Sequence, residues 1–461
     1  MSKLRFYLAM LAGKASNLAL RLIGRSTCYI PGHIAVSICK DFLAYLTPPK
    51  TVIAVTGTNG KTTVSNLITS ILRENGHSVT CNDLGPNMRT GIASAFLDHC
   101  TFSGKVTTEF AVLEVDEGSS PVVYSCMKPD YLICTNIMRD SIKHNAHPDY
   151  IAYVIGSAVP ETTTLVLNAD DMICSSVRRK NQECVYYGVD AMRPESYVSS
   201  HICDVVYCPK CGERFHQEYI RFNHIGRMSC PNCGNHSPEW DFVVTNVDPQ
   251  ANSFTVRHNG ISETYNLIND NLVNIYNFCG VIALLSKFGL TYEQISKGFT
   301  QTKIVKSRYD QVQVGGLTIT LQMAKGQNAM ACGRSYDYVA NLPGTNKGLI
   351  LLVDDKFDNV KDSESTCWLY DCDFSYFKDP SITQIVFAGP RCKDQYMRAL
   401  LAGVDEKKLK TVFVPKDGAK PFDIGDCRDI YIMYDVYYVE EANLVKDELI
   451  RRMEGGAGDG N

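Results

Sequence analysis

The most constraining feature of the sequence is a glycine-spaced turn between a strand-like run and a helix-like run near residue 57. Residues 51–55 are mostly β-branched and apolar, which is typical of a buried strand. The turn that follows reads T-G-T-N-G-K-T-T, with Gly57 and Gly60 three residues apart. From residue 64 onward, apolar residues recur at the spacing of an amphipathic helix. The pattern therefore predicts a strand, a tight turn and a helix.

This turn has the chemistry of a phosphate-binding loop. Glycines let the backbone approach a phosphate chain, and Lys61 can place a positive charge on the β- and γ-phosphates. The Thr62 hydroxyl is a suitable ligand for Mg²⁺, and the helix N-terminus adds its positive dipole end. The alternative is an ordinary glycine-rich strand-to-helix turn. A lysine and two threonines in register favour ATP binding, and the predicted ATP-binding residues of the loop are Gly57, Thr58, Asn59, Gly60, Lys61, Thr62 and Thr63.

Length and composition limit the class of protein. A chain of 461 residues is too long for one core. The formal net charge of -4 argues against a nucleic-acid partner. The 19 cysteines are scattered, many of them in apolar runs, which is typical of a reducing cytosol rather than of a disulfide framework. No stretch offers the roughly 18 uninterrupted apolar residues that a membrane span needs. We therefore expect a cytoplasmic globular protein of two or three domains.

The distribution of patterns divides the chain into four parts. Residues 1–47 form a helical segment, 48–310 an ATP-binding α/β domain, 311–453 a smaller α/β domain, and 454–461 a disordered tail. The first segment begins with a basic amphipathic helix, for which packing on the protein is favoured over resting on a membrane face. A turn at Pro31-Gly32 and a second helix over 36–46 are expected to follow it.

Strand-like and helix-like segments alternate in the ATP-binding part, which predicts a mostly parallel sheet with helices on both faces. The predicted strands are 52–56, 110–115, 131–135 and 164–168, followed by a two-strand pattern at 241–247 and 253–257. The predicted helices begin after Thr62 or lie around 91–97, 151–159 and 271–290.

Two C-x₂-C pairs interrupt this alternation between about 201 and 240. They are Cys208 with Cys211 and Cys230 with Cys233, separated by 18 residues, and a glycine follows each pair. Four thiolates complete a tetrahedral Zn²⁺ shell and leave no open position, so such a site is structural. The alternative is two free dithiols or a redox pair. The neighbouring Cys203, His216, His224 and His236 are not needed for the shell, and we interpret them as bystanders.

Polar residues follow several predicted strands at the edge where the phosphate loop lies. Glu114 ends the strand 110–115, and a carboxylate there can hold Mg²⁺ directly or through water. Asp116 and Glu117 are alternatives for this role, and a solvated acidic edge is the plainer interpretation. The runs 135–140 and 168–171 follow the next two strands. Asn277 lies near the start of the helix 271–290, where it is either a helix cap or a hydrogen-bonding partner for an adenine edge.

Six motifs follow one another along the chain: T-G-T-N-G-K-T-T, L-E-V-D-E, T-N-I-x-R-D, L-N-A-D-D, N-x-x-N and a basic S-R-Y. In this order they resemble the motifs of the ATPase domain of the Mur ligase family. Within it, the chain resembles the MurT-type subunits of lipid II isoglutaminyl synthase. Three features favour that subgroup. The two C-x₂-C pairs, which we call the knuckles, lie within the central domain, and the ATP loop occurs by residue 57, so a ligase N-terminal domain of ordinary size is missing. The segments L-A-G-K and I-P-G-H also resemble the start of such subunits. The resemblance implies a Mur ligase-type P-loop ATPase domain with an inserted zinc ribbon, plus a smaller C-terminal α/β domain.

The resemblance also implies further site residues. Asn277 and Arg308 join the ATP-binding residues, and Glu114 joins Thr62 as a magnesium ligand. Asp355, at the end of an apolar strand, matches the catalytic aspartate, while its neighbour Asp354 is a helix cap by the plainer interpretation. The chain departs from the ligases at Asp140-Ser141, where a metal-binding histidine is missing.

The implied activity is ATP-dependent amidation of the α-carboxyl of D-glutamate in the lipid II stem peptide, through an acyl phosphate. ATP, Mg²⁺ and Zn²⁺ are the implied cofactors, at the inner face of the cytoplasmic membrane. None of the 19 cysteines stands in a nucleophile-elbow context, so ammonia is expected from a GatD-type glutaminase subunit in a heterodimer. The alternatives are an amino-acid-adding Mur ligase, a folylpolyglutamate synthase relative, or a non-catalytic ATP-binding zinc-ribbon protein.

Overall fold

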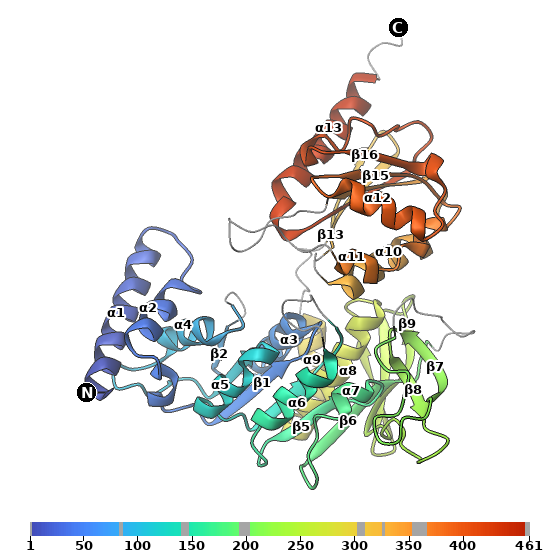
Figure 1. Ribbon diagram of the computed structural model, residues 1–461. Coiled ribbons are helices and arrows are strands. Elements are labelled where there is room, and N and C mark those ends of the chain that lie inside the picture. The colour runs from blue at the N-terminus through green and yellow to red at the C-terminus, as the bar shows by residue number, and fades with distance from the viewer. Residues whose placement is uncertain are drawn as a thin grey trace. The chain divides into compact units, whose positions relative to one another are not determined.

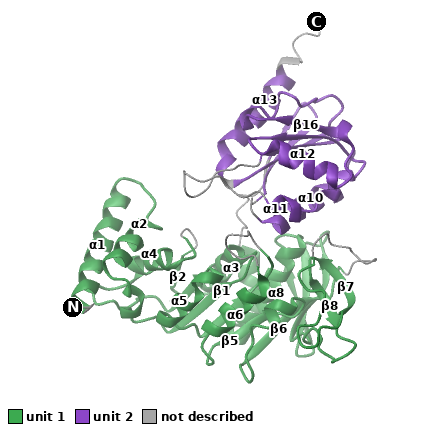
Figure 2. Ribbon diagram, viewed as in Figure 1, with its two compact units in different colours: residues 1–139, 147–199, 203–303 green, residues 140–146, 200–202, 304–461 purple. Residues whose placement is uncertain are grey.

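A computed structural model describes residues 2–82, 86–139, 147–192, 203–301, 309–324, 328–352 and 367–456. The described residues form two compact units, shown in Figure 2. Unit 1 holds the described residues up to 301, and unit 2 holds those from 309 onward. Each unit has its own hydrophobic core.

The described part of unit 1 is built on a nine-stranded sheet in the order β11-β10-β9-β6-β5-β4-β1-β3-β2. Neighbouring strands are parallel from β2 to β9, whereas β10 is antiparallel to both of its neighbours, β9 and β11. The strands are β1 Thr51–Thr56, β2 Val79–Cys81, β3 Phe110–Glu114, β4 Tyr131–Cys134, β5 Thr164–Asn168, β6 Cys184–Val189, β9 Phe242–Asp248, β10 Ser253–His258 and β11 Ile261–Asn266.

Helices cover both faces of this sheet (Figure 1). One group, α3, α8 and α9, packs together on one face, and α5, α6 and α7 pack on the other. The helices of unit 1 are α1 Ser2–Leu22, α2 Ile30–Ile38, α3 Lys61–Glu74, α4 Arg89–His99, α5 Ser120–Cys126, α6 Pro148–Ala158, α7 Met172–Ser175, α8 Leu272–Phe288 and α9 Tyr292–Gln301, with 3₁₀ turns Phe42–Tyr45 and Glu117–Ser119.

The structure confirms the predicted parallel sheet covered on both faces. The predicted strand 164–168 coincides with β5, and the strands at 52–56, 110–115 and 131–135 differ from β1, β3 and β4 by one residue at an end. The helix predicted at 271–290 is α8, which begins after the cap Asn271 and ends before Gly289.

Four details of these predictions were wrong. Pro31 and Gly32 are not a turn but part of the first turn of α2, where proline is tolerated because its nitrogen needs no intrahelical partner. The helix predicted over 36–46 is instead the end of α2 followed by the 3₁₀ turn Phe42–Tyr45. The two-strand pattern near 241–257 has a third member, β11, and the predicted tail begins too early because helix α13 continues to Gly456.

The knuckle region contains a β-hairpin made of β7 His216–Phe222 and β8 Ile225–Ser229. Its strands are antiparallel and form a separate two-stranded sheet. Short bridges from Tyr207 to Arg214 and from Ser229 to His236 extend the pairing toward both cysteine pairs. The hairpin thus brings the two knuckles to the same end of one small element.

The described part of unit 2 contains a six-stranded sheet in the order β12-β13-β17-β14-β15-β16. The strands from β13 to β16 are parallel, and β12 is antiparallel to β13. Its elements are β12 Tyr309–Val314, β13 Leu317–Met323, α10 Ala329–Asn341, β14 Lys347–Leu352, α11 Trp368–Asp371, β15 Ile382–Ala388, α12 Cys392–Leu401, β16 Leu409–Val412, β17 Asp429–Tyr434 and α13 Val439–Gly456, with 3₁₀ turns at 374–378, 406–408, 415–417 and 436–438. One of its two apolar clusters includes side chains of α10, α11 and α12 on one face of the sheet, and the other includes side chains of α13 on the opposite face.

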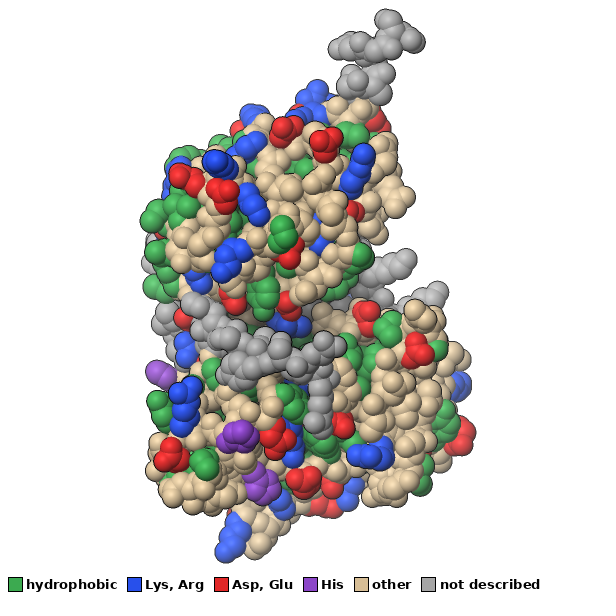
Figure 3. Space-filling view, turned by 90° about the vertical axis from the view of Figure 1, so that its right-hand side faces the viewer, with side chains coloured by type: hydrophobic (Ala, Val, Ile, Leu, Met, Phe, Trp, Pro, Cys, Tyr) green, Lys and Arg blue, Asp and Glu red, His purple; other side chains and the backbone are tan. Residues whose placement is uncertain are grey.

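The surface carries charges of both signs. On the face drawn in Figure 3, Lys and Arg side chains are interspersed with Asp and Glu side chains in both units. Within the described ranges, no helix combines the length and the apolar character needed to cross a membrane.

Candidate functional site

The turn between β1 and α3 is held in a conformation that requires its two glycines. Gly57 and Gly60 have positive φ angles of 119° and 93°, which other residues rarely adopt. A Cβ atom on Gly57 would lie 2.3 Å from the Thr135 hydroxyl, and one on Gly60 would lie 2.5 Å from the Asn277 side-chain oxygen. The loop therefore sits directly against the residues that follow β4 and against helix α8.

Residues after β4 hold the loop by its backbone. The Thr135 hydroxyl and the Asn136 side-chain amide both donate to the Asn59 carbonyl, at 2.7 and 2.9 Å. The Asn59 N–H donates in return to the Asn136 side-chain oxygen at 3.1 Å. The Thr58 hydroxyl donates to the Met138 carbonyl and accepts from the Met138 N–H, at 3.1 and 3.0 Å. The polar residues predicted to follow β4 therefore hold the phosphate loop in place through hydrogen bonds.

Lys61 is paired with a carboxylate that the sequence did not single out. Its ammonium donates to Glu117 Oε1 at 2.9 Å and to the Gly57 carbonyl at 2.5 Å. Burial lowers the pKa of Lys61, but the carboxylates of Glu117, Glu114 and Asp116 together outweigh burial and hold that pKa above its ordinary value. Burial raises the pKa of Glu117. Lys61 therefore remains a charged ammonium in the loop.

Of the predicted magnesium ligands, Glu114 ends strand β3 and Thr62 lies in the helix that follows the neighbouring strand β1. Glu114 pairs with Val55 in the β1–β3 register, two residues before Gly57. Its carboxylate is nearly buried, and the Asn87 amide approaches Oε1 to 3.5 Å. Thr62 stands in the first turn of α3 with an exposed side chain, and Thr63 beside it is half-buried. A hydroxyl and a carboxylate are oxygen donors of the kind that Mg²⁺ prefers.

Asn277 belongs to the phosphate loop's surroundings rather than to the start of its helix. The cap of α8 is Asn271, whose side chain accepts from the Val273 N–H, so the cap interpretation of Asn277 was wrong. Asn277 is buried in the second turn of α8 and lies against Gly60. Its amide nitrogen has no hydrogen-bond partner among the described residues. A buried, unpaired donor beside the loop is available to a ligand.

The two aspartates that follow β5 are fully buried and accept hydrogen bonds from several other segments of unit 1. Asp170 accepts hydrogen bonds from the Tyr276 hydroxyl on α8 at 2.7 Å and from the Trp240 indole at 2.8 Å. Its carboxylate also accepts from the Val189 N–H at 3.1 Å. These contacts join β5, β6, α8 and the segment that leaves the knuckle region.

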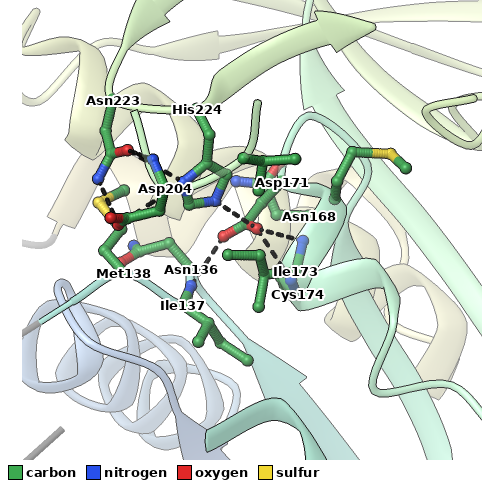
Figure 4. Close-up of polar contacts among 12 residues, drawn as sticks. Asn136, Ile137, Met138, Asn168, Asp171, Ile173, Cys174, Asp204, Asn223 and His224 are labelled. Carbon is green, nitrogen blue, oxygen red and sulfur yellow. Dashed lines mark hydrogen bonds and ion pairs between the residues drawn. The ribbon is translucent and has the colours of Figure 1, made fainter. Parts of the chain in front are cut away.

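Asp171 connects the loop support to the hairpin, as Figure 4 shows. One carboxylate oxygen accepts from the Ile137 N–H at 2.7 Å, and the other accepts from the Cys174 N–H at 2.8 Å and lies 2.9 Å from His224 Nε2. Burial lowers the pKa of His224, but the Asp171 and Asp204 carboxylates together raise it above its ordinary value. His224 is outside the cysteine group, as predicted, and is a buried anchor of the β7–β8 turn.

A second set of contacts joins Asp204 to Asn223, as drawn in Figure 4, and to Arg139. Asn223 donates to the Asp204 carboxylate at 2.7 Å, and Asp204 accepts from the Arg139 side chain at 2.7 Å. The Arg139 N–H also donates to Asp204, at 3.1 Å. The cysteine-bearing region is thus hydrogen-bonded to residues 137–139, which continue directly from the support of the phosphate loop.

The four knuckle cysteines converge. Their sulfur atoms all lie within 4.8 Å of one another. Sγ of Cys208 is 3.5 Å from that of Cys233, and Sγ of Cys211 is 3.4 Å from that of Cys230. Zn–S bonds of about 2.3 Å place tetrahedral sulfurs roughly 3.8 Å apart, so the group fits one Zn²⁺ ion.

The backbone around the cysteines also fits a metal. The glycines that follow the two pairs, Gly212 and Gly234, have positive φ and donate to the carbonyls of Cys208 and Cys230. The backbone N–H of Glu213 lowers the pKa of the Cys211 thiol. None of the histidines among the described residues belongs to this group.

Protein purified without added metal should contain about one zinc per chain, because four thiolates complete the shell. Cys230→Ser should lose the zinc and lower the free energy of unfolding by at least about 2 kcal/mol, since binding free energy at such a site is folding free energy. Elemental analysis and denaturant unfolding measure the two effects. Cys367→Ser, an exposed cysteine in unit 2, is the matched control and should change neither. A metal-free protein that is fully folded and active would refute the assignment.

Several predicted residues lie outside the described residues. These are Asp140, Ser141, Arg308, Asp354 and Asp355. Of the other predicted site residues, the structure brings the loop, Asn277 and the end of β3 to one edge of the sheet, and it gathers the cysteines at the hairpin. Sequence patterns offered Glu117 only as an alternative magnesium ligand, and they did not predict the contacts of Glu117, Asp171 and His224, since these contacts join distant segments.

Comparisons with known proteins agree with this arrangement. The family model described as Mur ligase middle domain matches residues 55–227, and the model described as MurT ligase C-terminal matches residues 326–436. A solved pseudomurein peptide ligase type C from Methanothermus fervidus has the same fold, with a TM-score of 0.66 at 18% identity over 89% of this chain and 81% of that chain.

Two curated relatives match almost from end to end. Both are named lipid II isoglutaminyl synthase (glutamine-hydrolyzing) subunit MurT. The protein of Staphylococcus aureus strain COL is 30% identical over 419 residues, covering 90% of this chain and 92% of the relative. The protein of Streptococcus pneumoniae strain R6 is 28% identical and covers 93% of this chain and 94% of the relative. Because the likeness runs through both units and both family models, this chain belongs to the MurT family of Mur ligase-fold proteins.

Proposed function

We propose that this chain is the ATP-dependent synthetase subunit of a lipid II isoglutaminyl synthase. The observation that carries the proposal is the match to MurT subunits over 90% of the chain, including a MurT-specific C-terminal region. The phosphate loop supports it, because two glycines at positive φ and a lysine whose side chain is 11% exposed lie at a helix N-terminus, an arrangement that favours phosphate binding.

The reaction proceeds in two steps. An oxygen of the D-glutamate α-carboxylate attacks the γ-phosphorus of ATP, and ADP leaves, which gives an acyl phosphate. Ammonia then attacks the acyl carbon and loses a proton, and inorganic phosphate leaves as the D-isoglutamine amide forms. The protein contributes mainly orientation and charge stabilisation to the phosphoryl transfer.

Each predicted residue has a part in this scheme. Lys61 neutralises charge on the transferred phosphoryl group, and the N–H groups of the loop bind the phosphate chain. The unpaired Asn277 amide and Arg308 bind the nucleotide. Thr62 and Glu114 hold Mg²⁺, which neutralises phosphate charge when bound. Asp355 orients ammonia or accepts its proton.

The other partners follow from the chemistry. Ammonia is scarce at neutral pH because ammonium dominates, so a supply passed directly from a GatD-type glutaminase subunit in a heterodimer is the efficient arrangement. The substrate is a lipid-linked peptide, so the subunit works at the inner face of the cytoplasmic membrane. The cysteine group holds a structural Zn²⁺ in a ribbon that the network of Asp171, His224 and Asp204 joins to the loop support.

The chain alone should amidate lipid II with ATP and ammonium at alkaline pH, and it should not use glutamine. Adding a GatD-type glutaminase should confer glutamine use, with one glutamate released per amide formed. Mass spectrometry of the stem peptide and assay of ADP and glutamate measure these outcomes.

Two results would contradict the proposal. Glutamine-dependent amidation by the purified chain alone would remove the need for a partner. Addition of an amino acid to a nucleotide-linked precursor, with no amidation, would assign the chain to the amino-acid-adding ligases instead. Lipid II whose stem already carries D-isoglutamine is the substrate control, because it should support no further ADP release.

A further inference from the structure

Helix α1 has two apolar faces, and one of them packs on the protein. Phe6, Met10, Gly13 and Asn17 recur at helical spacing and are buried. The packing is close, since a Cβ atom on Gly13 would lie 2.7 Å from the Leu97 side chain on α4. Figure 1 shows α1 at the outer edge of unit 1, beside α2 and α4. This face confirms the packing that the amphipathic pattern predicted.

The opposite face is a continuous stripe of exposed leucines. Its members lie four, three, seven and four residues apart, a spacing that keeps them in line along a helix. They are Leu4, Leu8, Leu11, Leu18 and Leu22. Their exposed fractions range from 51% at Leu8 to 79% at Leu22. The stripe spans about 27 Å at a rise of about 1.5 Å per residue. A long row of exposed leucines of this kind marks an interaction surface.

The charged residues of α1 and of the turn that follows it are all basic. All 50 Asp and Glu residues of the chain lie after residue 40, whereas residues 1–40 contain six Lys and Arg. Lys3 and Arg21 each precede a leucine of the stripe by one position, which places them about 100° around the helix from it. Lys3, Arg5, Arg21 and Arg25 are exposed, and Arg21 also contacts Asp98 on α4. The leucine stripe is therefore bordered by cations on a chain whose net charge is negative.

We propose that α1 lies in the interface of an anionic phospholipid bilayer, with its leucine stripe among the acyl chains and its basic side chains at the headgroups. An apolar helix face bordered by Lys and Arg is the pattern that binds such a surface. The inference rests on the proposed function, because an enzyme acting on a lipid-linked substrate gains from being held at the membrane. The buried face of α1 then attaches unit 1 to the bilayer through α2 and α4.

The test is sedimentation of the full chain with vesicles that contain neither lipid II nor ATP. We expect binding to phosphatidylglycerol–phosphatidylcholine vesicles that weakens as salt is raised, and at least about tenfold weaker binding to phosphatidylcholine alone. The variant with Leu4, Leu8, Leu11 and Leu18 all changed to Gln should lose at least about tenfold in binding to the anionic vesicles. The matched control, Leu401→Gln with Leu444→Gln, changes exposed leucines of unit 2 and should bind as the parent does.

Three results would overturn the inference. One is the absence of vesicle binding by the parent, and another is full binding by the four-leucine variant. The third is a dimer or complex that the stripe variant abolishes without any effect on vesicles, which would make the stripe a protein interface. Amidation of a short-chain, water-soluble lipid II analogue separates this inference from the proposed function. The stripe variant should amidate that analogue at the parent rate, and failure of the parent to amidate it would count against the proposed function alone.

Discussion

Replacing Lys61 by Met should reduce ATP turnover by at least about 10²-fold, because the charge that stabilises the transferred phosphoryl group is removed. The substitution also leaves the Glu117 carboxylate, 1% exposed, without its ion pair. Breaking a buried pair from one side costs about 3 kcal/mol. Lost activity alone would therefore not distinguish a phosphate-binding lysine from a structural one.

The double variant Lys61→Met with Glu117→Gln separates the two roles. Gln is neutral and similar in shape to Glu, so the double variant should recover most of the lost unfolding free energy and should still lack ATP turnover. Glu117→Gln alone is the control for the second change. Unfolding in urea, zinc content and ADP release are measured for all three variants. Recovery of ATP turnover in the double variant would show that Lys61 serves only to neutralise Glu117.

The sequence predicted those parts of the fold that local patterns determine. The strand β1, the turn and the helix α3 follow from β-branched residues, glycine spacing and helical periodicity within one short stretch. Some of the missed strands lack such a signal, although β6 was missed despite the β-branched and aromatic residues of its sequence, C-V-Y-Y-G-V. The strand β2 has three residues, and β11 is a mostly exposed edge strand whose sequence, I-S-E-T-Y-N, shows no apolar run. Its pairing with β10 fixes it as a strand, and that pairing is a tertiary contact.

The candidate site likewise has parts that the sequence predicts and parts that it does not. The loop and the four cysteines are recognisable because the chemistry demands fixed residue types at fixed spacings. Glu117 was not distinguishable from Glu114 and Asp116, since all three follow one strand and only the folded chain brings Glu117 to Lys61. Asn277 was ambiguous for a similar reason, because its neighbour Gly60 is more than 200 positions away.

Helix α1 shows a further limit of periodicity. Its sequence predicts a basic amphipathic helix, yet apolar residues occupy two opposite faces. Which face packs is decided by fit, because Gly13 allows α4 to approach only on its own side of the helix. The leucine stripe on the other side became visible only when the packed face was known.

Asp171→Asn should affect both stability and nucleotide binding, although residue 171 is not in the phosphate loop. The carboxylate is fully buried, and both of its oxygens accept backbone hydrogen bonds, from Ile137 on one side and from Ile173 and Cys174 on the other. An asparagine amide must turn its NH₂ group toward one of these sides, where it meets another donor. We expect the free energy of unfolding to fall by about 3 kcal/mol, since a buried donor is left unsatisfied.

We expect the Asp171→Asn change to weaken ATP binding through its effect on the segment that follows β4. The Ile137 N–H is adjacent to Asn136, whose amide bonds to both backbone groups of Asn59 in the loop. Loosening that segment should weaken nucleotide binding by roughly tenfold, as one lost hydrogen bond of about 1.4 kcal/mol would. Asp248→Asn removes the same charge at a surface turn and is the matched control. Urea unfolding and a fluorescent-nucleotide titration measure the two effects. Parent-like affinity in a destabilised Asp171→Asn variant would show that Asp171 holds the hairpin without positioning the loop.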